Sequence, residues 1–132
     1  MGAKINLANA SESISFGIDN VVIRRLGGTI LGGRALDVEG FNEPVIKAGH
    51  IIIQSEEDET IYRPMPVADG KYASLPKKFH YAGVLVSSVL TDKAAASIMY
   101  EGEVNDIASP YSIDEIRGAL KTALPTLVFL HD

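Results

Sequence analysis

The chain has 132 residues, a net charge of −5 and no cysteine. That length predicts one domain with a core large enough to fold without covalent cross-links. The lack of thiols excludes disulfides, Cys-ligated metal sites and a thiol nucleophile, and the negative charge disfavours general binding to nucleic acid. No apolar run reaches the roughly 20 residues that cross a bilayer, and the first residues lack the apolar core of a signal peptide. We therefore expect a protein that is made in the cytosol and binds neither nucleic acid nor membrane.

The amino-terminal segment differs in character from the rest of the chain. Residues 1–13 are small and polar, which predicts a mobile arm. Ile14, Phe16 and Ile18 then alternate with Ser and Gly, a pattern typical of a strand with one apolar face. We place an arm at residues 1–18 and a β-rich domain at residues 19–132. The alternating segment either adds to a sheet on a partner or belongs to the domain's own sheet, and the pattern leaves both open.

The first half of the domain reads as short strands between turns. Four glycines within residues 27–33 predict turns or bulges around a short β segment, and residues 36–39 predict another strand. The β-branched run at residues 51–53 and the β segment at 60–63 flank the acidic residues 56–59. Two apolar segments around a charged loop predict a hairpin with the carboxylates at its exposed tip.

The second half adds further strands and one helix. Asp69-Gly70 predicts a turn, residues 81–90 and 95–100 predict strands, and Gly102 predicts the turn after them. The sequence Ser112-Ile113-Asp114-Glu115 matches a capping box, after which apolar residues recur at helical spacing until Pro125. A short strand is expected at residues 126–130. The predicted fold is a β-dominated α+β domain, a compact β-barrel or sandwich-like body with one short C-terminal helix.

No complete catalytic constellation occurs in the sequence. His50, His80 and His131 do not share a helical i, i+4 spacing, and no Gly-x-Ser-x-Gly motif is present. The acidic residues 56–59 lack the ligand spacing of a calcium loop, and Gly33-Arg34-Ala35 lacks the lysine and hydroxyl of a phosphate-binding loop. We therefore expect no catalytic residue, no metal, no cofactor and no enzymatic activity.

The absence of a catalytic constellation favours a structural protein, but two other functions remain open from the sequence. Thr91-Asp92-Lys93-Ala94 resembles the turn that carries the lipoyl group in acyltransferase carrier domains, where the lysine stands at a hairpin tip. That resemblance covers only four residues, and a polar β-turn is the preferred interpretation of them. The other alternative is an unrelated β-rich binding module, for example for carbohydrate, although the absence of tryptophan and an aromatic content of 7% disfavour a stacking platform.

Several short motifs follow one another in a recognisable order along the chain. They are Arg24-Arg25-Leu26, residues 32–37, residues 46–51, residues 62–67, Ala82-Gly83-Val84-Leu85 with Val89, residues 95–100 and Gly102-Glu103-Val104. In this order they resemble the head decoration and head fibre proteins of tailed bacteriophages, and the two motifs nearest the amino terminus are closer to the head fibre group. The resemblance covers half to two-thirds of the chain and depends on the order of the motifs.

The resemblance implies a small β-rich body, commonly a homotrimer, on the outer surface of the virion head, made in the cytoplasm of the bacterial host. Its partner would be the major capsid protein. The resemblance implies that the protein binds this partner partly through its own amino-terminal segment, which becomes ordered on binding. Ile14, Phe16 and Ile18 are the candidate capsid contacts, because an alternating strand can add to an open sheet edge on the shell. Trimerisation would place three such arms together. Because binding of one arm raises the effective concentration of the other two at the capsid, the trimer would bind more tightly than a single arm.

Overall fold

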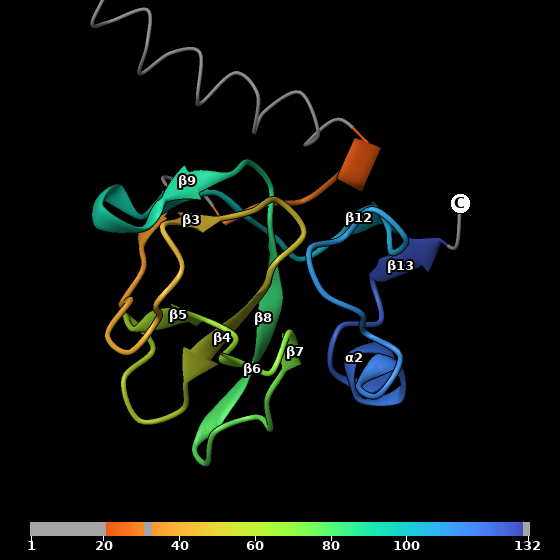
Figure 1. Cartoon of the computed structure of the whole chain (residues 1–132). Coiled ribbons are helices and arrows are strands. Elements are labelled where there is room, and N and C mark those ends of the chain that lie inside the picture. Colours follow the sequence, from red (N-terminus) through yellow and green to blue (C-terminus); the bar gives the residue numbers. More distant parts are fainter. Residues whose placement is uncertain (1–20, 31–32, 131–132) are drawn as a thin grey trace, which may run out of the picture.

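The computed structural model describes residues 21–30 and 33–130. Strands dominate this part of the chain, with one helix near its C-terminal end, which confirms the predicted β-dominated α+β class (Figure 1). The elements in chain order are β1 (Ile23–Leu26), β2 (Arg34–Ala35), β3 (Val45–Ile46), β4 (Ile51–Ser55), β5 (Tyr62–Pro64), β6 (Val67–Ala68), β7 (Lys71–Tyr72), β8 (Phe79–Leu85), β9 (Val89–Leu90), the 3₁₀ turn η1 (Thr91–Lys93), β10 (Ala95–Ala96), β11 (Ile98–Met99), β12 (Gly102–Asn105), α2 (Arg117–Ala123) and β13 (Leu127–Leu130).

A four-stranded antiparallel sheet in the order β11–β8–β4–β5 forms the centre of the fold. Strands β4 and β5 make the predicted hairpin, with Ile53 opposite Arg63, and the acidic residues 56–59 are exposed in the loop that joins them. Three short antiparallel pairs, β2–β10, β3–β9 and β6–β7, surround this sheet. The predicted turn at Asp69-Gly70 joins β6 to β7, and both residues have positive φ.

Strand β4 is buried on both faces, which explains its uninterrupted apolar sequence. Ile51 and Ile53 belong to one hydrophobic cluster, whereas Ile52 belongs to a second cluster on the opposite face, and none of the three is more than 1% exposed. Since side chains alternate along a strand, burial of one face alone would have given an alternating pattern. The central sheet therefore separates two core regions.

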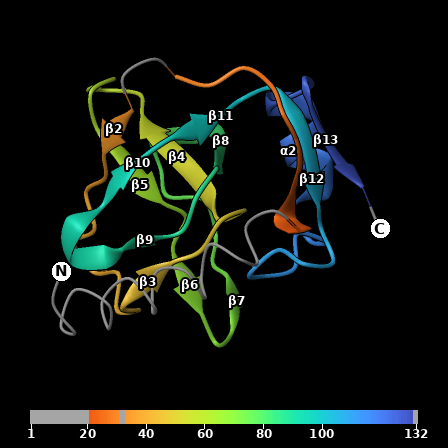
Figure 2. The same ribbon diagram turned by 90° about the horizontal axis from the view of Figure 1, so that it is seen from above.

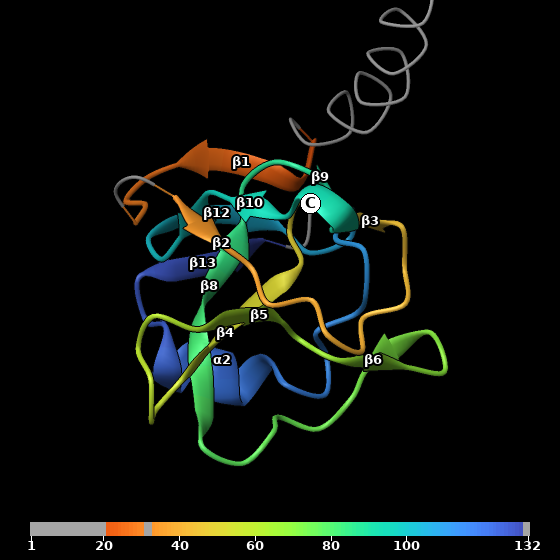
Figure 3. The same cartoon turned by 90° about the vertical axis from the view of Figure 1, so that its left-hand side faces the viewer.

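A second sheet lies to one side of the first and contains β1, β12 and β13 in that order. Figure 2 shows these three strands and α2 on one side of the molecule, with β2, β3, β9 and β10 on the other. Strand β1 pairs antiparallel with β12, and β12 pairs parallel with β13. The parallel pair needs a crossover, and α2 supplies part of it, burying Leu120 in the core cluster that also contains Leu127 (Figure 3).

Three details of the sequence prediction were wrong. Residues 81–90 do not form one strand, because β8 ends at Leu85 and β9 begins at Val89, where the chain turns to pair with β3. Gly102 does not end a strand in a turn; it begins β12, where an added Cβ would lie 2.5 Å from the Arg25 carbonyl oxygen. The short strand expected at residues 36–39 is displaced to Arg34–Ala35, with Leu36 in an isolated bridge to Tyr62.

The helix also begins later than the capping box predicted. The Ser112 hydroxyl accepts a hydrogen bond from the Asp114 amide at 3.2 Å, so it closes a local turn, and helix α2 begins only at Arg117. Ile113 is 2% exposed and belongs to the core cluster, and its carbonyl accepts a bond from the Ile116 amide. Burial of Ile113 by this preceding turn replaces the first helical turn that the pattern predicted.

Candidate functional site

The described chain begins and ends next to the same sheet. Val22 is buried directly before β1, and β13 ends at Leu130 on the other side of β12. The predicted contact residues Ile14, Phe16 and Ile18 lie outside the described residues, in the segment that leads into β1. The sheet β1–β12–β13 is therefore the part of the fold that adjoins the predicted arm.

The two faces of this sheet differ in chemistry. Ile23, Val104 and Phe129 stand side by side across the three strands and pack toward the core. The neighbouring row consists of Arg25, Glu103 and Val128, which face away from that core. Alternation along β12 and β13 accounts for Glu103 and Val128, and the register shift between Ile23 and Arg25 accounts for Arg25. The outer face thus presents an ion pair beside an apolar edge residue that is 46% exposed.

Arg25 holds two carboxylates on this outer face. Its Nε donates to Glu103 Oε2 at 2.9 Å and its Nη2 donates to Glu101 Oε2 at 3.2 Å. These hydrogen bonds raise the pKa of Arg25, with Glu103 as the larger cause, and the bond from Arg25 lowers the pKa of Glu101. Glu101 also accepts the Gly28 amide at 2.9 Å. Because all these side chains are well exposed, the network orders the surface more than it stabilises the fold.

The outer edge of β13 carries no paired strand within the described residues, where β12 is its only neighbour. The Gly102 amide donates to the Thr126 carbonyl at 3.2 Å, and the Asp106 amide donates to the Leu130 carbonyl at 2.9 Å. In a parallel ladder alternate residues face the neighbouring strand, so Phe129 directs its amide and carbonyl away from β12. The sequence Leu-Val-Phe-Leu contains no lysine, proline or other residue that usually protects an edge.

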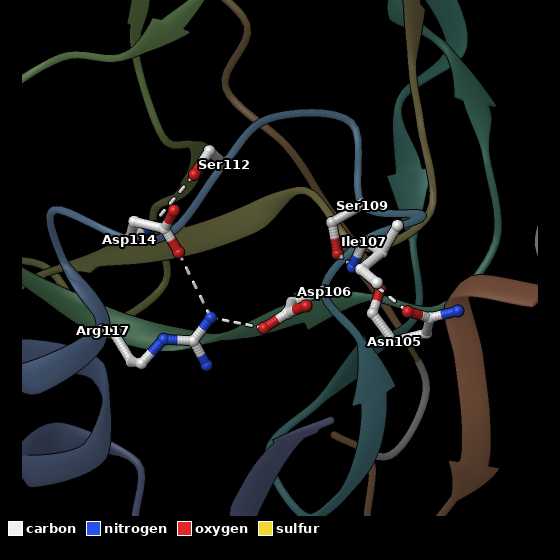
Figure 4. A network of polar contacts seen from close by, with 7 residues as sticks. All are labelled: Asn105, Asp106, Ile107, Ser109, Ser112, Asp114 and Arg117. Atoms are coloured by element: carbon white, nitrogen blue, oxygen red, sulfur yellow. Dashed lines mark hydrogen bonds and ion pairs between the residues drawn. The ribbon is translucent and has the colours of Figure 1, made fainter. Parts of the chain in front are cut away.

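A polar network around the buried Asp106 side chain links the end of this sheet to α2 (Figure 4). The Asp106 side chain is 4% exposed and accepts a hydrogen bond from Nη2 of Arg117, which also contacts the exposed Asp114. These bonds raise the pKa of Arg117, with Asp106 as the first cause. Because the Asp106 amide also donates to the Leu130 carbonyl, the network holds the end of β13 in place.

His50 forms the centre of an aromatic cluster near a surface cleft. Its ring lies edge-to-face with Phe41, Tyr72 and Tyr111 at centroid distances of 5.2–5.6 Å. Nε2 donates to the Met65 carbonyl at 2.9 Å, since that oxygen can only accept, and burial lowers the His50 pKa to about 4. Two adjoining clefts of about 420 and 380 Å³ share Phe41, Glu43 and Tyr111 in their linings.

His80 and Lys93 lie on other elements than the aromatic cluster around His50. His80 is half-buried and its Nε2 lies 2.8 Å from Gln54 Oε1, whereas His131 is outside the described residues. Lys93 is exposed in η1; β9 before it pairs with β3, and β10 after it pairs with β2. The lysine therefore does not stand at the tip of a hairpin. Residues 21–30 and 33–130 contain no cluster of three or more His, Asp or Glu that could hold a metal ion.

Comparison with known proteins finds no matching family model, curated protein or solved structure. Among the described residues, no helix is long and apolar enough to span a membrane.

Proposed function

We propose that the protein is a structural head protein of a tailed bacteriophage or prophage. It binds the major capsid protein on the outer surface of the virion head and performs no chemistry. The observation that carries this proposal is the sheet β1–β12–β13, which adjoins the predicted arm and in which, among residues 21–30 and 33–130, no strand pairs with the outer edge of the apolar β13. An edge of this kind is suited to association with another chain.

The motifs that carry the sequence resemblance fall on elements that build the body of the fold. Gly83-Val84-Leu85 ends the central strand β8, and Gly102-Glu103-Val104 begins β12. Gly83 allows β11 to approach closely, since an added Cβ would lie 2.3 Å from the Met99 carbonyl oxygen. Gly83 and Gly102 thus have packing reasons within a β-rich body of the kind that the resemblance implies.

In the proposed assembly three copies form a homotrimer on the shell, and Ile14, Phe16 and Ile18 of each arm add to an exposed sheet edge of the capsid. Each arm buries a modest area. Once one arm of the trimer has bound, the other two are held close to the shell at a high effective concentration, which strengthens binding. Many copies on one shell then stabilise it collectively. No cofactor, nucleic acid or membrane takes part.

Co-sedimentation of the purified protein with shells of the major capsid protein from the same phage tests the proposal. The full chain is expected to sediment with the shells, and a variant without residues 1–18 is expected to remain in the supernatant while keeping the wild-type circular dichroism spectrum. Size-exclusion chromatography with light scattering is expected to give three times the 14.1-kDa chain mass. Failure of the full chain to bind the shells would contradict the proposed function, and a monomer would contradict the trimer.

A further inference from the structure

We infer that the cleft beside His50 binds a guanidinium group, supplied by an arginine side chain of another polypeptide. Four side chains make up this guanidinium site and line the cleft of about 380 Å³: Phe41, Glu43, His50 and Tyr111. The inference goes beyond the proposed attachment to the capsid and does not depend on it, because these described residues alone carry it.

One nitrogen of the His50 ring has no hydrogen-bond partner among residues 21–30 and 33–130. Nε2 donates to the Met65 carbonyl, so Nδ1 of the neutral ring carries a lone pair and can only accept. His50 is only 1% exposed, yet no buried side-chain nitrogen or oxygen in the described part of the chain lacks a partner. Nδ1 must therefore retain contact with solvent. Since His50 lines the cleft, this lone pair opens into it and offers an acceptor to a ligand.

Two aromatic rings stand beside this acceptor. Phe41 and Tyr111 lie edge-to-face with the His50 ring at centroid distances of 5.4 and 5.6 Å. Both rings also line the adjoining cleft of about 420 Å³, and both are half-buried, so part of each ring is accessible. Because the face of an aromatic ring is electron-rich, accessible rings of this kind attract a cation, and a planar guanidinium stacks on them well.

The charged side chains along the two adjoining clefts also favour a cation. They are four carboxylates and two cations: Asp37, Glu39, Glu43, Asp69, Lys47 and Arg63. Arg63 Nε lies 3.7 Å from Asp37 Oδ2, so this pair largely cancels, and three carboxylates remain against Lys47. Burial raises the pKa of Tyr111, and the nearby Glu43 carboxylate raises it further. A positive group between this ring and this carboxylate is therefore attracted by both.

A guanidinium group matches this combination of acceptors and rings better than an ammonium group does. It is planar and carries five N–H donors in a fixed fork, so its edge can donate to two acceptors while its face rests on a ring. The two acceptors here are Nδ1 of His50 and the carboxylate of Glu43. An ammonium group is a compact and strongly hydrated charge, which gains less from a ring face.

The guanidinium comes from outside this chain. The chain has five arginines, namely Arg24, Arg25, Arg34, Arg63 and Arg117. All five lie in the described part of the chain, where each already contacts another group. Residues 1–20, 31–32 and 131–132 contain no arginine. A free amino acid is disfavoured as well, because its carboxylate would meet the acidic lining of the clefts. An arginine within another polypeptide carries no such carboxylate.

NMR titration of the ¹⁵N-labelled full chain with N-acetyl-arginine amide tests the inference. The Nδ1 resonance of His50 is expected to move toward the position of a hydrogen-bonded nitrogen. The amide signals of Phe41 and Glu43 are expected to shift with a dissociation constant on the order of 1 mM. N-acetyl-citrulline amide has the same shape without the charge and is expected to bind roughly tenfold more weakly. Equal binding of the two compounds, or an Nδ1 resonance that does not move at saturation, would overturn the guanidinium site.

Two variants that each remove one carboxylate charge locate the binding. Glu43→Gln is expected to weaken binding of N-acetyl-arginine amide roughly fivefold. Glu56→Gln removes the same charge from the exposed β4–β5 loop, outside both clefts, and is expected to bind within about twofold of wild type. Equal losses in E43Q and E56Q would reduce the effect to net charge and overturn the site.

A chain without residues 1–18 separates an external ligand from the chain's own arm. This shortened chain is expected to bind N-acetyl-arginine amide within about twofold of the full chain, because the arm supplies no guanidinium. Binding that is roughly tenfold tighter would show that the arm competes for the cleft. That result would overturn the assignment of the site to another polypeptide.

Discussion

The imidazole Nε2 of His50 lies 2.9 Å from the main-chain carbonyl oxygen of Met65, with three aromatic rings around the histidine. Burial lowers the His50 pKa from 6.5 to about 4, so the ring is neutral in the folded protein at neutral pH. In the unfolded chain the histidine binds a proton below pH 6.5. Folding stability is therefore complete above pH 6.5 and falls as the pH drops to about 4, by about 3 kcal/mol.

Urea unfolding at pH 7 and pH 5 measures this loss. The variant His50→Gln is expected to be less stable than wild type at pH 7 and to lose less stability between the two pH values, because the titrating group is gone. His80→Gln, which changes a half-buried histidine bonded to Gln54, serves as the control and is expected to keep the wild-type loss. An equal pH dependence in wild type and H50Q would refute the role of His50.

Local patterns predicted the features that depend on neighbouring residues. The β4–β5 hairpin follows from two β-branched runs around exposed carboxylates, and the positive φ of Asp69 and Gly70 follows from their turn chemistry. The capping box misled because it contains only local information. Burial of Ile113 at 2% exposure depends on packing against distant strands, and packing outweighs a cap worth about 1 kcal/mol.

The sequence pattern did not predict which distant segments pair with one another. Arg25 contacts Glu103 across 78 positions, and nothing in either segment identifies the other as its partner. The parallel pairing of β12 with β13, which leaves β13 at the edge of its sheet in the described part of the chain, likewise depends on the crossover through α2. The alternation of Ile14, Phe16 and Ile18 is a local signal that the sequence carries, whereas the position of β13 at the edge of its sheet became apparent only once its neighbour was known.

Gly83 and Gly118 form a matched pair of glycines with opposite expected responses to alanine. A Cβ at Gly83 would lie 2.3 Å from the backbone oxygen of Met99, so Gly83→Ala must displace β11 and is expected to cost on the order of 2 kcal/mol. Gly118 lies exposed in α2 with nothing within 4 Å of an added Cβ. Gly118→Ala is expected to stabilise the protein by up to about 1 kcal/mol. Thermal and urea unfolding check both, and a neutral G83A would contradict the close approach.

Lys93 provides a direct test of the carrier alternative. In lipoyl carrier domains, which the four residues 91–94 resemble, the lipoylated lysine stands at a hairpin tip, whereas Lys93 lies in a 3₁₀ turn between strands that pair with different partners. Intact-mass measurement after co-expression with lipoylation enzymes is therefore expected to show the unmodified chain. A mass increase that disappears in Lys93→Arg would support the carrier function and count against the structural one.

Arg117 and Asp106 connect α2 to the end of the β1–β12–β13 sheet. Arg117→Met removes the guanidinium and leaves the Asp106 carboxylate, 4% exposed, without this partner. Because Arg117 itself is 33% exposed, solvent screens part of the loss, and a cost of about 2 kcal/mol is expected. Asp114→Asn changes the exposed carboxylate that also contacts Arg117, and it is expected to change the free energy of unfolding by less than about 0.5 kcal/mol. Urea unfolding of the two variants and of R117M/D106N separates the energy of the Arg117–Asp106 pair from the cost of burying the carboxylate. Equal effects of R117M and D114N would show that the Asp106 pair contributes no more to stability than the exposed Asp114 pair.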